Sequence, residues 1–327
     1  MRQSQKQGRT TFFRSLFLYF ALIVPLACLA QAFPSKPVRI IVPLAAGGTG
    51  DILGRLVGDA LAAGLGAAVV VDNRPGSGGT IGTEAVARSL PDGHTLLHTS
   101  ASHIANAALR PKLPYDAIRD FAVVARTADT HQLVVAHPAF PPNTLEELIQ
   151  YCRQNRVFYG SSGNGSSTHL NMELLKSLAG IPIEHVPYKG STQSRTDLIA
   201  GQIQLSVDGL VPTLPHIRAG RLKAIALASS RRSVVAPEIP TIGEAGVPAY
   251  RTDTWYALYA PAGVPAPILE KLRETVSAAL QSGPVRDKML QQGAEPADPS
   301  PALLEKQMRE EFARWSKLVA EASIKVD

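Results

Sequence analysis

Cysteine and long apolar runs are both scarce in this sequence, and each absence limits the class of protein. Its 327 residues include two cysteines, and Cys28 lies in an N-terminal segment that we expect to be removed. Cys152 would then be alone, so no intramolecular disulfide can form. Burial of apolar side chains must hold the fold together, and roughly 295 residues suffice for one large or two moderate domains. Beyond residue 32, no apolar run approaches the length of a transmembrane helix.

The motifs of common enzyme classes are also absent. The sequence has no Gly-x-Ser-x-Gly elbow, no Walker-type Gly-Lys-Ser/Thr, and no His-Glu-x-x-His or Cys-x-x-Cys pair. Eight histidines are scattered along the chain, and we interpret them as structural rather than metal-binding. We therefore predict no catalytic residue, no cofactor and no metal site.

Residues 1–32 have the composition of a secretory signal peptide. Four basic residues and no acidic one precede an apolar stretch from 16 to 29, which is too short to span a bilayer comfortably. Ala30 and Ala32 put small residues at the two positions that a signal peptidase reads. We predict cleavage after Ala32 and export, with a retained membrane anchor or a lipid on Cys28 as the alternatives.

Most of the basic excess lies in this predicted leader. The chain has 33 Lys and Arg against 27 Asp and Glu, and removing the four basic residues of the leader leaves 29 against 27. A nearly neutral mature surface has no electrostatic footprint for nucleic acid and no polybasic membrane patch. The sequence therefore predicts no nucleic-acid partner.

The stretch from Val42 to Asp51, VPLAAGGTGD, organises the rest of the chain. Residues 38–42 predict a buried strand, and residues 51–63 have apolar side chains at helical spacing. The first amides of a helix lack internal partners and carry a partial positive charge, and glycines let a ligand approach them. This combination predicts an anion-binding turn. The alternative is a tight connection that binds nothing.

Strands and helices alternate along most of the remaining chain, which indicates α/β architecture. Strands are expected at 67–72 and 95–98. A second series follows, with a strand at 157–160, a polar Gly/Ser turn at 161–168 and a helix at 169–178. This order repeats that of the opening stretch, so two lobes could each point a helix N-terminus at a shared cleft.

The last third predicts an aromatic strand at 255–260 and amphipathic helices at 265–281, 284–292 and 301–322. In the last helix, one face carries apolar side chains that we expect in the core: Phe312, Trp315 and Leu318. Earlier in the chain, Thr144 and Glu147 stand at the spacing of a helix capping box.

His169 follows the Gly/Ser turn and raises the alternative of a secreted hydrolase. Such an enzyme needs an activated serine and an orienting carboxylate, for which Asp208 is available. Four serines of the turn could be the nucleophile: Ser161, Ser162, Ser166 and Ser167. Because nothing in the spacing requires this arrangement, we prefer a structural role in which His169 orders the turn by a side-chain hydrogen bond.

Taken together, these stretches resemble the Bug receptors, periplasmic substrate-binding proteins related to tripartite tricarboxylate transporters. The resemblance begins with residues 42–51 and continues in the same order through further segments: 73–82, 91–97, 113–116, 162–170, 185–190, 240–246 and Trp255. These motifs are specific jointly rather than singly, and they extend over nearly the whole chain after residue 32.

The resemblance implies a two-lobed periplasmic binding protein, a Venus flytrap of type II-like α/β fold. Each lobe would be a mostly parallel sheet flanked by helices, with lobe one formed by 33–130 and 231–327 and lobe two by 131–230. It implies a monomeric periplasmic receptor, not an enzyme, that captures a small carboxylate in the cleft. The ligand could be a di- or tricarboxylate, an amino acid or an aromatic acid, delivered to a tripartite tricarboxylate-type transporter or reported to a sensor protein.

The resemblance also implies the ligand-binding residues, with the first turn holding a carboxylate and the Gly/Ser turn closing over it. Lobe one would supply Ala46, Gly47, Gly48, Thr49 and Asp51, and lobe two Ser162, Asn164, Ser167, Thr168 and His169, with Asp208 at the edge of the cleft. The chain departs from the family pattern at Leu44, where an aromatic is usual, and at Gly50, where a small hydroxylic or amide residue is common.

Besides a receptor and a hydrolase, a third possible function is a ligand-independent interaction protein that kept the fold.

Overall fold

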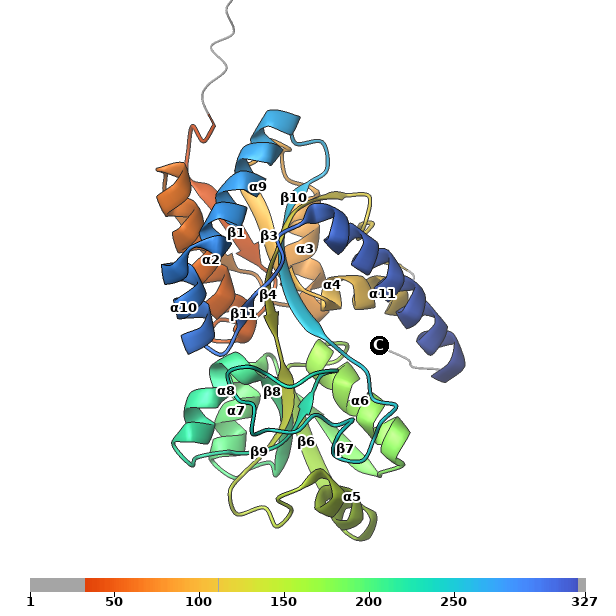
Figure 1. Cartoon of the computed structure of the whole chain (residues 1–327). Coiled ribbons are helices and arrows are strands. Elements are labelled where there is room, and N and C mark those ends of the chain that lie inside the picture. The colour runs from red at the N-terminus through yellow and green to blue at the C-terminus, as the bar shows by residue number, and fades with distance from the viewer. Residues whose placement is uncertain (1–32, 111, 323–327) are drawn as a thin grey trace, which may run out of the picture. The chain divides into compact units, whose positions relative to one another are not determined.

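The computed structural model describes residues 33–110 and 112–322, which fall into a short segment ending at Ser35 and a compact unit starting at Lys36. The predicted signal peptide, its cleavage site and Cys28 lie outside the described residues. From Lys36 onward the unit contains two β-sheets with helices packed around them, which confirms the two-lobed α/β fold (Figure 1). None of its described helices is long and apolar enough to cross a membrane.

The first sheet, with its helices, is called lobe one here, and its strand order is β11-β4-β10-β3-β1-β2. Its strands are β1 (Val38–Val42), β2 (Val69–Asn73), β3 (Thr95–Ser100), β4 (Phe121–Thr130), β10 (Thr254–Pro261) and β11 (Glu295–Pro296). β1 pairs in parallel with β2 and β3, whereas β10 is antiparallel to both β3 and β4. The sheet is therefore mixed rather than mostly parallel, because β10 returns from the C-terminal third and inserts between β3 and β4.

The second sheet, with its helices, is called lobe two, and its strand order is β7-β6-β8-β5-β9. Its strands are β5 (Gln132–Ala136), β6 (Val157–Ser161), β7 (Ile183–Pro187), β8 (Leu205–Gly209) and β9 (Lys223–Ala228). β6 is parallel to β7 and β8, while β5 is antiparallel to β8 and β9. The chain enters this lobe directly from β4 into β5, and we propose residues 130 and 230 as the lobe boundaries. The connection from β9 to β10 still contributes Ile239, Ile242 and Tyr250 to buried clusters with residues of lobe two.

The helices surround both sheets. In lobe one they are α2 (Thr49–Leu65), α3 (Thr80–Ala87), α4 (Ser102–Leu109), α9 (Ala266–Gln281), α10 (Gly283–Gln291) and α11 (Pro301–Ala322), with a 3-10 turn, η1 (Ser77–Gly79), before α3. In lobe two they are α5 (Leu145–Gln154), α6 (Ser167–Ala179), α7 (Ser191–Ile199) and α8 (Leu210–Arg218). The predicted capping box of Thr144 and Glu147 at the start of α5 is confirmed. α2 begins earlier than predicted, because Gly48 is its N-cap with extended backbone.

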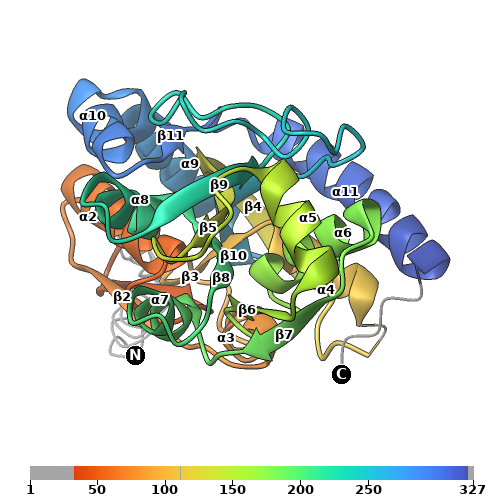
Figure 2. The same ribbon diagram turned by 90° about the horizontal axis from the view of Figure 1, so that it is seen from below.

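Strand β5 shows how lobe two is packed. Successive side chains of a strand point to opposite faces of the sheet. Val134 and Ala136 belong to a buried cluster with residues of α5 and α6, while Leu133 and Val135 belong to another with residues of α7 and α8. Figure 2 accordingly shows α5 and α6 on one side of this sheet and α7 and α8 on the other. Both faces are covered, so functional residues are confined to the ends of the strands.

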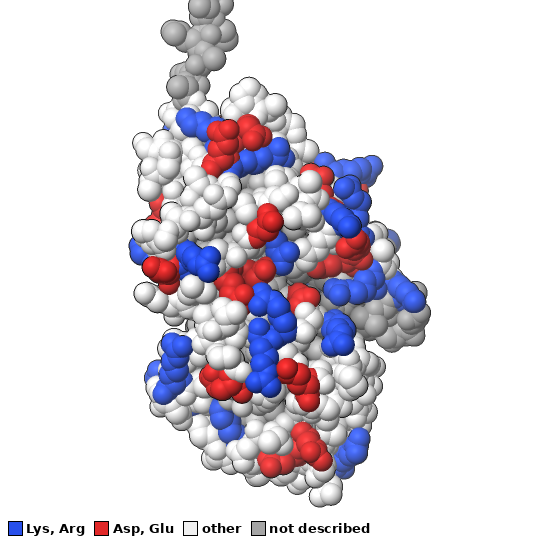
Figure 3. Space-filling model, in the orientation of Figure 1, with Lys and Arg blue, Asp and Glu red and all other residues white. Residues whose placement is uncertain are grey.

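The predicted apolar face of α11 is only partly buried. Phe312 is 38% exposed, so the expectation that it belongs to the core is wrong. Trp315 is partly buried against a small cluster that includes Leu109 and Leu170, and the side chain of Leu318 lies outside the described residues. Lys and Arg are interspersed with Asp and Glu over most of the face drawn in Figure 3, apart from one run of blue side chains near its centre.

Candidate functional site

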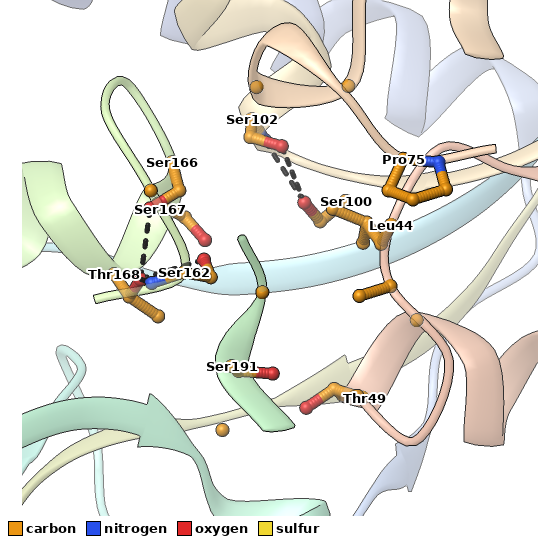
Figure 4. Close-up of a pocket in the computed structure, with 18 of the residues that line it drawn as sticks. Leu44, Thr49, Pro75, Ser100, Ser102, Ser162, Ser166, Ser167, Thr168 and Ser191 are labelled. Atoms are coloured by element: carbon orange, nitrogen blue, oxygen red, sulfur yellow. Dashed lines mark hydrogen bonds between the residues drawn. The ribbon is translucent and has the colours of Figure 1, made fainter. Parts of the chain in front are cut away.

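A cavity of about 460 Å³ lies between the strand ends of lobe one and lobe two. It is lined by many hydroxyl groups, from Thr49, Ser100, Ser102, Ser162, Ser166, Ser167, Thr168 and Ser191 (Figure 4). Of the eleven predicted ligand-binding residues, the lining includes Gly48, Thr49, Ser162, Asn164, Ser167, Thr168 and Asp208. The cavity is therefore rich in hydroxyl groups, and both lobes contribute to it.

The first turn keeps two backbone amides unpaired at the start of α2. Gly48 caps the helix without a side-chain hydrogen bond, and its carbonyl accepts from the N–H groups of Asp51 and Ile52. Among the described residues, the N–H groups of Thr49 and Gly50 have no partner. Both residues line the cavity, so the helix presents donors and its positive end there.

Other predicted donors of this turn are occupied by the protein itself. The backbone N–H of Gly47 donates to Asp51 Oδ2 at 2.9 Å, and that of Gly48 makes a long bond to Ala45 O at 3.4 Å. A carboxylate in the first helical turn is stabilised by the helix dipole, so Asp51 fits a role in shaping the turn. The cavity lining does not include Asp51, Gly47 or Ala46.

The two departures from the family pattern are coupled in space. A Cβ added to Gly50 would lie 2.6 Å from Cδ1 of Leu44 and 3.3 Å from Tyr256. Leu44 therefore fills the space that a larger residue at position 50 would need. Both Leu44 and Gly50 line the cavity, so the pair changes its shape while preserving the turn.

Lobe two holds the first turn through Arg195, which the sequence analysis missed. Arg195 Nη2 donates to the carbonyl of Gly47 at 3.0 Å, and Nη1 donates to Asp208 Oδ2 at 2.6 Å. Both charged side chains are buried. Thr192 adds a second bond between the lobes, from Oγ1 to Ala46 O at 2.9 Å. The sequence signal was indirect: an acid at the end of an apolar strand needs a cation if it is buried.

Asp208 lines the cavity as predicted, but its carboxylate is occupied. Oδ1 accepts from the backbone N–H of Gly209 at 2.7 Å, and Oδ2 accepts from Arg195. Burial raises the pKa of the Asp208 carboxyl, and the adjacent guanidinium opposes that rise. Asp208 therefore anchors Arg195, and a ligand meets a neutralised acid.

The Gly/Ser turn of lobe two is organised by its own hydroxyl groups. Thr168 Oγ1 accepts from the backbone N–H of Ser162 at 2.9 Å and bonds the hydroxyls of Ser162, at 2.9 Å, and Ser166, at 3.0 Å. Ser166 is also the N-cap of α6 and accepts from His169 N–H at 3.2 Å. Local bonds thus fix this turn at the edge of the cavity.

His169 supports the Gly/Ser turn without lining the cavity. Its Nδ1 accepts from the N–H of Gly165 at 3.2 Å, which confirms the predicted turn-ordering bond. Its ring stacks on His185 with centroids 4.1 Å apart, and it is not among the residues that line the cavity. Burial lowers the pKa of His169.

The described residues do not form a hydrolase triad. The Ser–His contact in this region joins Ser161 Oγ and His185 Nε2 at 2.6 Å, and Ser161 is fully buried. Burial and the neighbouring His169 lower the pKa of His185 to about 4. Asp208, the candidate carboxylate, is bonded to Arg195 instead.

A second glycine-rich turn, from Gly76 to Gly79, forms another wall of the cavity. Gly76, Ser77, Gly78 and Gly79 all have positive φ, a conformation that glycine adopts without strain. Arg110 Nη1 donates to the carbonyl of Ser77, and Asn106 to that of Gly78, both at 2.8 Å. The sequence analysis included this segment, within 73–82, in the family resemblance but did not assign it to the site, because its distance from the first turn is set only by the fold.

Basic side chains outweigh acidic ones in the cavity lining. Arg110 and Lys189 contribute positive charge, while Asp208 is the acidic residue and is paired with Arg195. Gln132, at the start of β5, donates to Ser167 Oγ of α6 at 2.7 Å, a bond within lobe two. Among the residues that the structure describes, no cluster of His, Cys, Asp and Glu could hold a metal ion.

Comparison with known proteins identifies the family. The model of the tripartite tricarboxylate transporter family receptor matches residues 53–324. Protein BugT of Bordetella pertussis is 35% identical over 301 residues, covering 91% of this chain and 92% of BugT.

Two solved structures from Rhodopseudomonas palustris are also similar. Rpa4515, solved with adipate, has a TM-score of 0.85 and 36% identity over 90% of this chain and 99% of its own. MatC, solved with bound malate, has a TM-score of 0.82 and 35% identity over 88% of this chain and 100% of its own. This chain therefore belongs to the tripartite tricarboxylate transporter family of receptors, as its resemblance to the Bug receptors implied, and is a periplasmic solute-binding receptor rather than an enzyme.

Proposed function

We propose that this receptor captures a small carboxylate in the cavity between its lobes and presents it to a tripartite tricarboxylate-type transporter or to a sensor protein. The observation that carries the proposal is the charge balance of the cavity. Its one acidic residue, Asp208, is neutralised by Arg195, whereas Arg110 and Lys189 add positive charge. The unpaired amides at the start of α2 add donors without adding any acceptor.

Neutral donors are sufficient for useful affinity. A hydrogen bond to a charged group contributes about 1.5–3 kcal/mol. Micromolar binding needs about 8 kcal/mol, which several such bonds supply after the costs of ordering are subtracted. Two relatives were solved with adipate and with malate, both carboxylates, which supports the same ligand class for this chain.

The predicted site residues divide into two proposed roles. Six are proposed to contact the ligand, since they line the cavity: Gly48, Thr49, Ser162, Asn164, Ser167 and Thr168. Five are proposed to hold the two turns in shape: Ala46, Gly47, Asp51, His169 and Asp208. Ligand binding would stabilise the closed arrangement through contacts to both turns at once, and the closed form is what a partner would recognise.

Thermal-shift screening against mono-, di- and tricarboxylates tests the ligand class, with the corresponding neutral amides as controls. We expect stabilisation by one group of acids and none by their amides. Native mass spectrometry of protein purified without refolding would identify a retained ligand and would test the proposed monomer. If no acid stabilises the protein, or if amides stabilise it equally, the carboxylate proposal is wrong.

Small-angle scattering tests the closure itself. We expect the radius of gyration to fall when the saturating acid is added, because closure brings the lobes together. An unchanged value at saturation contradicts closure while leaving the ligand class intact.

A further inference from the structure

Ser167 is the residue of the Gly/Ser turn whose hydroxyl takes no part in the bonds within that turn. Thr168 bonds the hydroxyls of Ser162 and Ser166, whereas Ser167 Oγ is bonded to the side-chain amide of Gln132. Ser167 is partly buried and lines the cavity, and Figure 4 shows its side chain directed toward the open space there. The direction of the bonds that this hydroxyl makes therefore bears on the ligand.

The bond from Gln132 leaves the proton of Ser167 unused. Gln132 Nε2 donates to Ser167 Oγ at 2.7 Å, so the serine oxygen is the acceptor in that bond. A serine hydroxyl has one proton and two lone pairs. No acceptor among the described residues is bonded to this proton. Ser167 therefore keeps a free side-chain donor at the cavity.

Asn171 determines which end of the Gln132 amide faces Ser167. Asn171 Nδ2 donates to Gln132 Oε1 at 2.7 Å, so the amide oxygen is occupied and the NH2 group is left for the serine. Both amide side chains are buried, with Gln132 4% and Asn171 6% exposed. The backbone of Gln132 is fixed as well, because it pairs with Gly209 of β8 and Ala228 of β9. The bonds from Asn171 through Gln132 to Ser167 therefore form a chain of fixed direction on rigid elements.

The start of α6 also favours a negative group beside this hydroxyl. Ser166 is the N-cap, and its Oγ accepts from the N–H of His169. The backbone N–H groups of Ser167 and Thr168 have no partner in the part of the chain that the structure describes. Unpaired amides at the positive end of a helix dipole attract anions. The hydroxyl of Ser167 adds a side-chain donor to these two backbone donors.

We infer that Gln132 is a positioning residue for ligand binding: it holds the proton of Ser167 available for the carboxylate of the ligand, and Asn171 holds Gln132 in turn. With the amide reversed, Gln132 Oε1 would take that proton, and the serine would present only lone pairs, which repel a carboxylate. The inference rests on the proposed carboxylate function. It adds the two buried side chains that prepare lobe two for such a ligand.

A double-variant cycle tests the inference by isothermal titration calorimetry at pH 7.5. The probe is whichever of succinate, malate, adipate and citrate binds the parent protein most tightly. We expect Ser167→Ala to weaken binding about tenfold or more, and Gln132→Met about fivefold. In the Ser167→Ala background, Gln132→Met should weaken binding by no more than about twofold further, because its effect passes through the missing hydroxyl. Equal losses in both backgrounds would mean that Gln132 only supports the fold, and would overturn the inference.

A variant outside the cavity lining and a matched control sharpen the test. Asn171 does not line the cavity, and Asn171→Leu releases the amide of Gln132, so we expect binding about threefold weaker. Gln204 is the matched glutamine, since its side chain accepts from the N–H of Phe158 away from the cavity. Gln204→Met should leave affinity at the parent value. A loss in Gln204→Met as large as that in Gln132→Met would overturn the inference.

Melting temperatures show which variants fold. If Gln132→Met does not fold, Asn171→Leu with and without Ser167→Ala completes the same cycle. If none of the four acids binds the parent protein, the proposed function fails and the inference with it. If an acid binds but the losses of the two single variants simply add, only the inference is overturned.

Discussion

The first turn of lobe one and the Gly/Ser turn of lobe two are built alike in sequence but are held in different ways. The turn of lobe two is bonded within itself, with Thr168 joining the hydroxyls of Ser162 and Ser166. The turn of lobe one has few side chains of its own and is held by Arg195 and Thr192, which belong to lobe two. One turn therefore keeps its shape by local bonds, and the other takes part of its shape from the opposite lobe.

This difference implies that the geometry of the first turn is coupled to closure of the lobes. When the lobes separate, the carbonyls of Ala46 and Gly47 lose the donors that orient them. The ligand-binding amides of lobe one would then be fully arranged only in the closed form.

Loss of Arg195 should have the largest effect. Arg195→Leu leaves Asp208 buried without its cation, and we expect the free energy of unfolding to fall by about 3–5 kcal/mol. The double variant Arg195→Leu/Asp208→Leu should recover most of this loss, because the uncompensated charge is gone. Urea denaturation measures both.

An exposed ion pair provides the control for Arg195. Arg156 pairs with Glu184, and their side chains are 70% and 47% exposed. Arg156→Leu should therefore change stability far less than Arg195→Leu does. Equal effects of Arg195→Leu and Arg156→Leu would contradict the anchoring role of the buried pair.

Acid should destabilise lobe one more than lobe two. Burial lowers the pKa of His98, which packs beside Gly54 of α2, to about 4, and burial together with His169 does the same for His185. Unfolded histidines titrate near 6.5, so the unfolded chain binds more protons as pH falls, and stability declines between about pH 6.5 and 4. His98 can contribute at most about 3 kcal/mol to this decline, and the half-buried His185 less.

Histidine variants test this order. Denaturation at pH 7.5 and 4.5 should show a smaller pH dependence in His98→Gln than in the parent protein, and an intermediate one in His185→Gln. A decline that neither variant reduces would place the titrating group elsewhere.

Loss of the hydroxyl of Thr168 should disturb the locally bonded turn. Thr168→Val leaves the backbone N–H of Ser162 without its acceptor, which should cost about 1–3 kcal/mol of stability and weaken ligand binding. Thr144→Ala, at the capping box of α5, should cost about 1 kcal/mol without altering affinity. Calorimetry and urea denaturation together distinguish the two. Unchanged affinity in Thr168→Val would argue against a role of this turn in binding.

The smallest effect is expected for the exposed bond between the lobes. Thr192→Ala removes the donor to the Ala46 carbonyl and should cost about 0.5 kcal/mol of the closed form. Stopped-flow measurements should show ligand leaving about twofold faster. A change of more than tenfold would mean that this contact, rather than Arg195, dominates closure.

Features that depend on neighbouring residues were predicted well. The strand β1 and the helix α11 have the predicted bounds, because their apolar spacing is regular. The turn-ordering bond of His169 was also predicted, since His169 and Gly165 are four residues apart. Polar residues near a helix start bond locally whatever the rest of the chain does.

Features that join distant segments were not predicted. The position of β10 between β3 and β4 depends on pairing with strands more than a hundred residues earlier, and no pattern within β10 specifies those partners. Arg195 lies in a polar helix whose sequence resembles a solvated face, yet it is buried against Asp208 and reaches Gly47. His131 bonds Glu295 across 164 residues.

By itself, the sequence determined the α/β architecture, the two turns and the receptor family, because apolar periodicity, glycine placement and motif order are properties of short segments. Only the tertiary structure decided which amides remain unpaired at the cavity and which acid is neutralised by a buried cation. Those properties depend on burial and on contacts between side chains far apart in the chain, and neither leaves a periodic signal in the sequence.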